Sequence, residues 1–253
     1  RFEHIVVDGC SKDDTLDVLR QYRHVRWISE PDHGEGEALN KALRMARGAV
    51  IGWLNADDYY LPGVFPTVAR ELDPARGRHV LCGKTRLMLD SDAEIRTADP
   101  TRPVTVSSLL RWSEPHHLWQ PSLFYSRALV EEIGPFREDL RFSIDYEYWL
   151  RICARGHAFV PVDQIFSVYR ARQHAAKSSG TAHLQAMSWY EVSLPYLRHV
   201  RPAERIRFRW NYARFRIRNY LVREAPIPVP LLRMLFRMVE TLFPRPAGNR
   251  SWT

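Results

Sequence analysis

Residues 4–9 read HIVVDG, a short apolar run that ends at an aspartate and a glycine. β-Branched residues dominate this run, which is typical of a buried strand in a parallel sheet. The next apolar residues recur at helical spacing and predict a helix over 14–23. The pattern then repeats, with a strand at 25–28, a helix at 38–46 and a strand at 49–54. Strands that alternate with helices at these lengths predict an α/β fold with a mostly parallel sheet flanked by helices.

The rest of the chain is less periodic, and its elements are predicted one by one. Strands are expected at 80–83, 85–89 and 123–125, helices at 106–112, 127–133 and from about 145, a polar loop over 90–103, and two short extended runs within 158–170. Residues 181–223 fit one long helix or two, although an alternation over 205–212 also fits a strand. A proline-rich linker and a helix over 231–243 are expected to follow.

Composition and charge exclude several classes of protein. The 253 residues are 45% hydrophobic, which is enough for a sizeable core, and three scattered cysteines fit a reducing compartment better than a disulfide scaffold. No apolar stretch approaches the roughly 18 residues that a spanning helix needs. Residues 181–253 hold 13 arginines against four glutamates, whereas the remainder holds 24 basic and 25 acidic residues. We therefore predict a globular domain over 1–180 and a basic α-helical module over 181–253.

Carboxylates follow three of the predicted strands. Asp8 ends the first strand, Asp32 follows the second, and Asp57 and Asp58 follow the third. Because ligands of open α/β sheets bind beyond the carboxyl ends of the strands, we expect these side chains to line one crevice. Their mutual repulsion calls for hydrogen-bond donors or a cation, and a divalent metal is the economical explanation. Asp8 or Asp32, taken singly, would also suit the cap of the following helix. The adjacent residues Asp57 and Asp58 cannot both act as caps.

Six segments of the sequence together resemble a known family. They read IVVDGCSKDDT (5–15), SEPDHG (29–34), GWLNADD (52–58), WQPSLF (119–124), IGPF (133–136) and IDYEYWLR (144–151). In this order and at these spacings they resemble the inverting family 2 glycosyltransferases of the GT-A fold, over residues 1 to about 180. That family's domain normally begins with a further strand and a P-x-Y-N-like turn. The resemblance therefore implies a GT-A domain truncated at its N-terminus.

The resemblance implies a donor site. The residues that match nucleotide-sugar-binding positions of the family are Asp8, which would contact the base, and Asp32, Asn40, Lys41, Asn55 and Asp58. Asp57 matches the last position of the family's D-x-D pattern and would bind Mg²⁺ or Mn²⁺, although Asn55 departs from the pattern at its first position. His174 would complete the metal site. Arg170 and Lys177 would lie near the diphosphate of the donor.

The resemblance also implies a catalytic base. Asp145 matches the family's catalytic aspartate, and inversion requires a base within about 3 Å of the acceptor hydroxyl. Glu147 is a weaker alternative, and Asp145 would equally suit a helix N-terminus or an exposed helical surface. Trp119 and Gln120 are placed on the acceptor side. Trp119 and Trp149 are candidates for stacking on a sugar, but both also suit a hydrophobic core.

The sequence therefore predicts a metal-dependent enzyme that moves a sugar from a UDP- or GDP-linked donor to a saccharide or lipid-linked acceptor. Its expected role is cell-surface polysaccharide biosynthesis, and its expected location is the cytoplasm. The basic tail is expected to contact anionic membrane peripherally through residues 198–237. A catalytically inactive binding or assembly module that retains the fold is the alternative. Nucleic acid is not expected as a partner, because no recognised motif accompanies the tail.

Overall fold

A computed structural model describes residues 2–89, 94–100, 102–111, 118–171 and 181–223. Two strands, β1 (His4–Asp8) and β2 (Val25–Ser29), pair in parallel as a sheet of their own. The second sheet has the order β3 (Val50–Gly52), β7 (Leu123–Ser126), β5 (Val80–Leu89), β8 (Phe159–Ala171) and β4 (Tyr59–Tyr60), and β6 (Glu94–Ala98) also pairs with β5.

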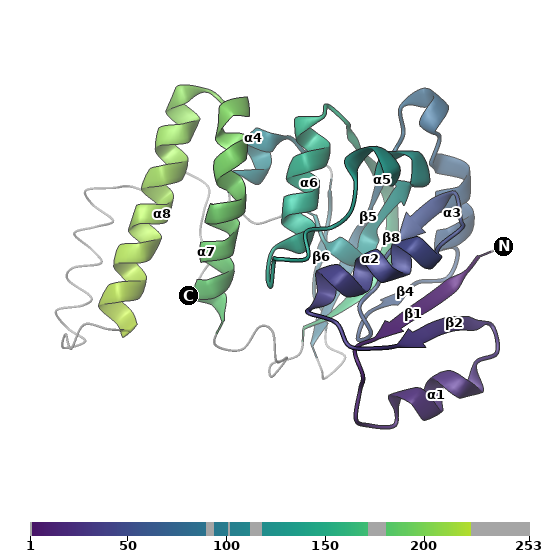
Figure 1. The fold of residues 1–253 in the computed structure, drawn as a ribbon. Helices are drawn as coiled ribbons and strands as arrows, with labels where there is room; N and C mark the ends of the chain where they lie inside the picture. The colour runs from purple at the N-terminus through teal and green to yellow at the C-terminus, as the bar shows by residue number, and fades with distance from the viewer. Residues whose placement is uncertain (1, 90–93, 101, 112–117, 172–180, 224–253) are drawn as a thin grey trace.

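Helices flank both sheets (Figure 1). They are α1 (Thr15–Gln21), α2 (Glu35–Met45), α3 (Val64–Glu71), α4 (Val106–Leu109), α5 (Arg127–Ile133), α6 (Ile144–Ala154), α7 (Ala182–Ser193) and α8 (Pro202–Arg223), with short 3₁₀ turns at Pro74–Arg76, Gln120–Ser122 and Leu194–His199. The small sheet and α1 lie at one end of the molecule, and α7 and α8 lie at the other.

The predicted α/β architecture is confirmed, but the large sheet is mixed rather than mostly parallel. Only β5 and β8 run parallel there, whereas the other pairs of that sheet are antiparallel. One antiparallel strand, β6, occupies part of the predicted polar loop over 90–103. The side chains of Glu94, Arg96 and Thr97 are exposed, so this edge strand has no apolar pattern to reveal it.

Other differences from the predicted elements have equally local causes. The two extended runs within 158–170 form the single strand β8, because Pro161 and Asp163 interrupt the apolar pattern without ending the pairing to β5. The strand β4 and the helix α3 were not anticipated. Residues 205–212 are helical, and the region over 181–223 forms two helices separated by a 3₁₀ turn.

The C-terminal helices share the main hydrophobic core. Val192, Leu197, Val200 and Phe208 are buried and belong to the same cluster as the residues of α6. The predicted boundary at residue 180 stays a prediction, and the predicted helix over 231–243 lies outside the described residues. In the part of the chain that the structure describes, no helix has the length and apolar character needed to cross a bilayer.

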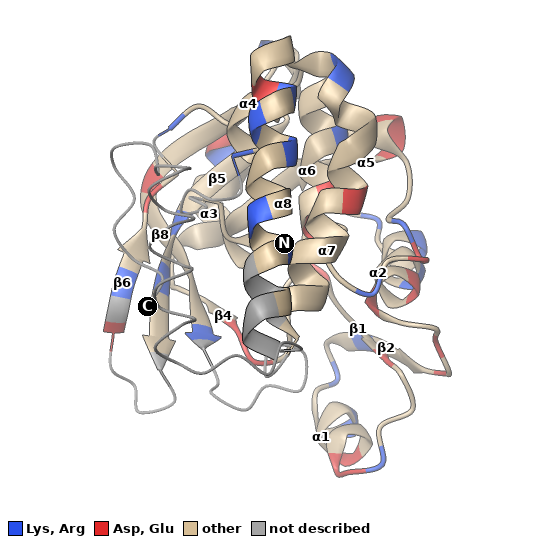
Figure 2. Ribbon diagram, turned by 90° about the vertical axis from the view of Figure 1, so that its left-hand side faces the viewer, with Lys and Arg blue, Asp and Glu red and all other residues tan. Residues whose placement is uncertain are grey.

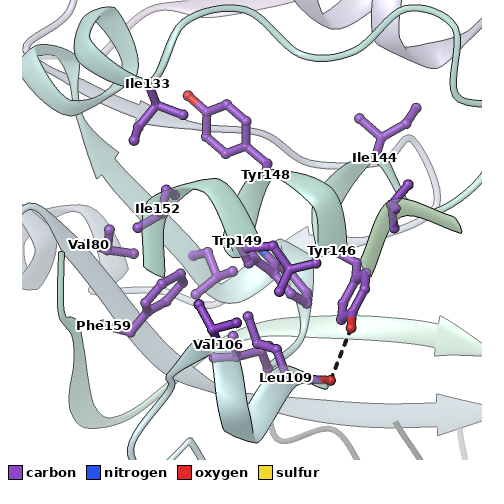
Figure 3. Packing of buried hydrophobic residues seen from close by; sticks show 14 of the residues in the cluster. Val80, Val106, Leu109, Ile133, Ile144, Tyr146, Tyr148, Trp149, Ile152 and Phe159 are labelled. Atoms are coloured by element: carbon purple, nitrogen blue, oxygen red, sulfur yellow. Dashed lines mark hydrogen bonds between the residues drawn. The ribbon is translucent and has the colours of Figure 1, made fainter. Parts of the chain in front are cut away.

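The helix α6 passes through this core (Figure 3). Tyr148, Leu150 and Ile152 are completely buried. At the first turn of α6, the Tyr146 hydroxyl donates to the carbonyl oxygen of Leu109 at 3.1 Å. The beginning of α6 is thus fixed by packing and by a buried hydrogen bond, which holds the neighbouring Asp145 at a defined place.

Candidate functional site

A turn between β3 and β4 positions the two adjacent carboxylates. The backbone N–H of Asp58 donates to the carbonyl oxygen of Asn55 at 3.1 Å. The chain then enters β4, which pairs antiparallel with β8 and brings the turn beside Arg170. The backbone N–H of Arg170 donates to Oδ1 of Asp58 at 3.0 Å. Asp58 is buried, whereas Asp57 is half-buried and Asn55 is exposed.

The second carboxylate oxygen of Asp58 is buried and has no hydrogen-bond partner among the described residues. Burial, together with the negative charge of Asp57, raises the pKa of Asp58 to about 6 against the opposing effect of its contacts with Arg170. A buried carboxylate oxygen without a partner is unfavourable, so a cation or a donated hydroxyl would stabilise it. This orphaned oxygen fits the predicted place for a donor or its metal.

Asp145 and the acidic turn both influence one tyrosine, Tyr169, electrostatically. Burial raises the pKa of the Tyr169 hydroxyl, and the negative charges of Asp58, Asp57 and Asp145 raise it further. Charges affect a titrating group appreciably only within a limited distance, so the three carboxylates lie within electrostatic range of Tyr169. The ring of Tyr169 lies 4.8 Å from that of Trp119, measured between centroids. Asp57, Asp58 and Asp145 thus act electrostatically on one tyrosine, whose ring also pairs with that of Trp119.

Tyr169 is the site residue that sequence reasoning missed. The motif around it suggested a role for Arg170, but Tyr169 itself looked like an ordinary strand residue. It is half-buried at the far end of β8, opposite Leu87 of β5. The signal that could have revealed Tyr169 was the acidic motif directly before β4. The strand that pairs with β4, which is β8, carries side chains beside that motif.

Trp119 and Gln120 open the short 3₁₀ turn that leads directly into β7. The side-chain N–H of Gln120 donates to the carbonyl oxygen of Trp53 at 2.6 Å. The Gln120 Oε1 and the Trp119 Nε1 are buried and have no partner in the described part of the chain. These two polar atoms, beside the Trp119–Tyr169 ring pair, are suited to hydrogen bonds with a ligand.

Trp149 and Glu147 have structural contacts instead. The Trp149 Nε1–H donates to the Tyr125 hydroxyl at 3.1 Å inside the core, as the core alternative for this residue predicted. Glu147 is buried and accepts hydrogen bonds from Arg151 at 3.0 Å and from the Tyr196 hydroxyl at 3.1 Å. Because these donors occupy its carboxylate inside the fold, Glu147 is poorly suited to act as a base.

Asp8 and Asp32 form a second acidic group at the ends of β1 and β2. Asp8 is buried, and it accepts hydrogen bonds from the Ser29 hydroxyl at 2.6 Å, from the Ser11 backbone at 3.1 Å and from the Ser11 hydroxyl. A Cβ added to Gly9 would lie 2.7 Å from Oδ2 of Asp32, so this carboxylate lies against the Gly9 backbone. The two acids are thus neighbours, and their contact with a nucleotide stays a prediction.

The Asp8 contacts predict a pH-dependent stability. Hydrogen bonds from the Ser11 and Ser29 hydroxyls lower the pKa of Asp8. The stabilisation is therefore present above the unfolded-state pKa of about 4 and is lost as the pH falls through the folded-state value. We expect Ser29→Ala to lower the free energy of unfolding by about 1–2 kcal/mol at pH 6, and by less at pH 3. Urea unfolding at both pH values measures this difference.

Ser188→Ala is the matched control. The Ser188 hydroxyl donates to the uncharged carbonyl oxygen of Phe142 at 3.0 Å, so its loss should cost the same at both pH values. An equal loss at pH 6 and pH 3 for Ser29→Ala would show that the Asp8 charge does not stabilise this turn.

The Asn40 side chain makes hydrogen bonds within the protein. It is buried, its side-chain N–H donates to the carbonyl oxygen of Phe136 at 2.9 Å, and its Oδ1 accepts from the Phe136 backbone at 2.9 Å. One turn earlier, a Cβ on Gly36 would lie 2.6 Å from the carbonyl oxygen of Arg137. The helix α2 is thus docked closely on the loop at 136–138. These contacts give Asn40 a structural role, and its predicted nucleotide contact stays a prediction.

Lys41 is also paired within the protein. Its Nζ lies 3.0 Å from carboxylate oxygens of both Glu30 and Glu37, and it donates to the carbonyl oxygen of Pro31 at 2.7 Å. These contacts join α2 to the loop that follows β2. Its predicted contact with the donor stays a prediction.

The predicted metal site is only partly within the described chain. Among the described residues, no group of three or more His, Cys, Asp and Glu side chains is arranged to hold a metal ion. His174 and Lys177 lie outside the described residues. The adjacent carboxylates of Asp57 and Asp58, with one orphaned oxygen, nonetheless have the donor chemistry that Mg²⁺ and Mn²⁺ prefer.

The mixed sheet, its flanking helices and the acidic turn define the protein as a member of the GT-A fold class. The chain belongs to glycosyl transferase family 2, whose model matches residues 1–134. The family resemblance of the sequence motifs is thereby confirmed.

Relatives and solved structures agree with this assignment. A Rickettsia prowazekii protein described as an uncharacterised glycosyltransferase is 24% identical over 84% of this chain and 68% of its own length. An uncharacterised Mycobacterium tuberculosis protein is 26% identical over a region that spans 71% of this chain and 60% of that relative. The structure of Staphylococcus aureus TarS 1-349 in complex with UDP-GlcNAc matches with a TM-score of 0.66 and 18% identity, over 94% of this chain and 72% of that one.

Proposed function

We propose that this chain transfers a sugar from a nucleotide-linked donor to a hydroxyl of a saccharide or lipid-linked acceptor, with inversion at the anomeric carbon. The observation that carries the proposal is the acidic turn, where the buried Asp58 has one carboxylate oxygen without a partner among the described residues and Asp57 lies beside it. The charges of these two residues and of Asp145 act on Tyr169. Membership of glycosyl transferase family 2 supports the reaction class. The TarS structures hold UDP-GlcNAc and UDP, which makes UDP-sugars the first donors to test.

Each residue of the site has a separate role in the proposed reaction. Asp145 would accept the proton of the acceptor hydroxyl as that oxygen attacks the anomeric carbon. Trp119 offers a ring face and an N–H to a sugar at the same place. Asp57, with Asp58 beside it, would hold Mg²⁺ or Mn²⁺. When bound, the ion would neutralise charge on the departing nucleoside diphosphate as a Lewis acid.

The setting proposed for this reaction is cell-surface polysaccharide assembly at the inner face of a membrane. The relatives include Escherichia coli chondroitin synthase, which is 27% identical over 61% of this chain and 22% of its own length. A lipid-linked acceptor would be presented at a bilayer surface, and the basic C-terminal region is the part of the chain suited to meet it.

The proposed donor reaction is tested with a panel of UDP- and GDP-sugars in the presence of Mn²⁺. Release of the nucleoside diphosphate, with water as the acceptor, avoids the need for a known acceptor. We expect turnover of at least one donor, and we expect Asp57→Ala to reduce it about 10²-fold or more, because one metal ligand is lost. Asp17→Ala, which removes an exposed acid of α1 paired only with Arg20 in the described contacts, is the control.

Two results would contradict this proposal. Full turnover by Asp57→Ala would show that the Asp57 carboxylate of the acidic turn is not needed for the reaction. Binding of UDP without any turnover would instead favour an inactive binding module that retains the fold.

A further inference from the structure

The helix α8 carries large apolar side chains on two opposite faces. On one face, Phe208 is buried in the main core and stacks on Tyr190 of α7, with 5.4 Å between ring centroids. Tyr212 stacks on the same tyrosine. The opposite face carries four exposed residues that we name the α8 stripe: Ile206, Trp210, Ile217 and Tyr220. A helix that only packs against its own domain is polar on its outer side, and α8 is not.

The exposure of the α8 stripe is large and continuous. The four side chains retain 59%, 51%, 49% and 58% of their accessible surface, in chain order. At about 100° per residue they fall within an arc of about 80° on the helix surface. They therefore form a single band along the helix instead of scattered apolar residues, which is the kind of exposed patch that marks an interaction surface.

Arginines border this band on both sides. By the same helical spacing, Arg207 and Arg214 lie along one edge, and Arg205, Arg209 and Arg216 lie along the other. The sequence of α8 contains one acidic residue, Glu204, which lies in its first turn. Figure 2 faces the side of the molecule on which α8 lies and shows basic residues recurring along the helix. The outer side of α8 is thus apolar in the middle and cationic at both margins.

We propose that this side of α8 binds the surface of an anionic lipid bilayer. The α8 stripe would enter the boundary between headgroups and acyl chains, and the bordering arginines would contact lipid phosphates. Trp210 and Tyr220 are residue types that favour this boundary. The inference rests on the proposed function and deepens it, because it assigns residues of α8 to the surface where a lipid-linked acceptor would be held.

Charge and side-chain type favour lipid over the other occupants. A second copy of this chain would bring its own arginines against those of the first, which is unfavourable. The C-terminal segment over 224–253 contains four arginines and two glutamates, so it is also basic. Single-stranded nucleic acid binds by stacking bases on rings, which only Trp210 and Tyr220 of the α8 stripe carry, whereas all four side chains can enter a bilayer.

The experiment is sedimentation of the full chain with vesicles, without donor or acceptor. We compare vesicles of phosphatidylcholine alone with vesicles in which about a third of the lipid is phosphatidylserine. The wild-type protein should bind the anionic vesicles preferentially, and added salt should weaken that binding. Trp210→Ser combined with Ile217→Ser should lower the partition coefficient about tenfold or more. Arg209→Glu should lower it about fivefold or more.

Matched variants on α1 and near β5 test whether the effect is specific. Val18 and Tyr22 are exposed apolar residues at 43% and 52%, and the Arg76 side chain is 82% exposed. Val18→Ser with Tyr22→Ser, and Arg76→Glu by itself, should leave vesicle binding within about twofold of wild type. Circular dichroism and urea unfolding check that every variant is folded, so that lost binding is not lost structure.

Three results would overturn the inference. The first is equal binding of the wild-type protein to neutral and anionic vesicles, and the second is unchanged binding by the α8 stripe variant. The third is a concentration-dependent dimer, or an oligonucleotide complex, that forms in preference to vesicle binding and that the same two substitutions abolish. A failure of sugar transfer would leave these measurements unaffected, so the two proposals fail separately.

Discussion

Asp145→Asn is expected to lower the rate of nucleoside diphosphate release about 10³-fold while UDP binding changes less than about twofold. The carboxylate lies in the first turn of α6, within electrostatic range of Tyr169 as Asp57 and Asp58 are, and it is the base that we propose for the attacking hydroxyl. A positioned general base contributes about 10²–10⁴-fold to a rate. Asparagine keeps the shape of the side chain but cannot accept the proton. Single-turnover rates and calorimetric titration with UDP measure the two quantities.

Glu147→Gln distinguishes the two carboxylates of this helix. The Glu147 carboxylate is buried between Arg151 and Tyr196, so its substitution should lower the free energy of unfolding by about 2–3 kcal/mol with little effect on the rate. Rapid release by Asp145→Asn, together with slow release by a folded Glu147→Gln protein, would reverse the assignment of the base.

The fold was predictable where side-chain pattern and burial agree. The strands β1 and β2 and the helix α5 lie close to their predicted ranges, since apolar residues fill their inner positions. The strand β6 was not predictable in this way, because its stability comes from backbone pairing with β5 while Glu94 and Arg96 face solvent. Strand direction was also missed, because alternating strands and helices do not specify antiparallel neighbours such as β3 and β7.

The sequence indicated which residue types form the site better than it indicated which residues they contact. The motif around Asp57 and Asp58 indicated an acidic turn, and the structure places it beside β8 as a single local unit. The same reasoning assigned Asn40 to the nucleotide, which stays a prediction, and it did not reveal that the Asn40 amide holds the Phe136 backbone. A motif gives no information about partners 96 residues away along the chain. Tyr169 was missed for the same reason, since its role comes from the strands and carboxylates around it.

Asp58→Asn should separate stability from activity. The wild-type protein holds a buried carboxylate with one oxygen unpartnered among the described residues and with Asp57 beside it. Asparagine removes the charge and keeps an acceptor for the Arg170 backbone N–H. We therefore expect the free energy of unfolding at pH 7.5, without metal, to rise by about 1–2 kcal/mol. The unpaired side-chain N–H₂ left by asparagine limits the gain, because it is buried too.

The same substitution should reduce kcat/KM for the donor about 10²-fold, because the orphaned oxygen is the one available to the donor or its metal. Asp57→Asn is the control for stability. Asp57 is half-buried and destabilises Asp58 only through its charge, so Asp57→Asn should reduce donor turnover while raising the free energy of unfolding by clearly less than Asp58→Asn does. Urea unfolding and initial rates on the same preparations measure both effects. A less stable Asp58→Asn protein would contradict this prediction. It would mean that the Asp58 carboxylate stabilises the fold as a hydrogen-bond acceptor and that its orphaned oxygen is not destabilising.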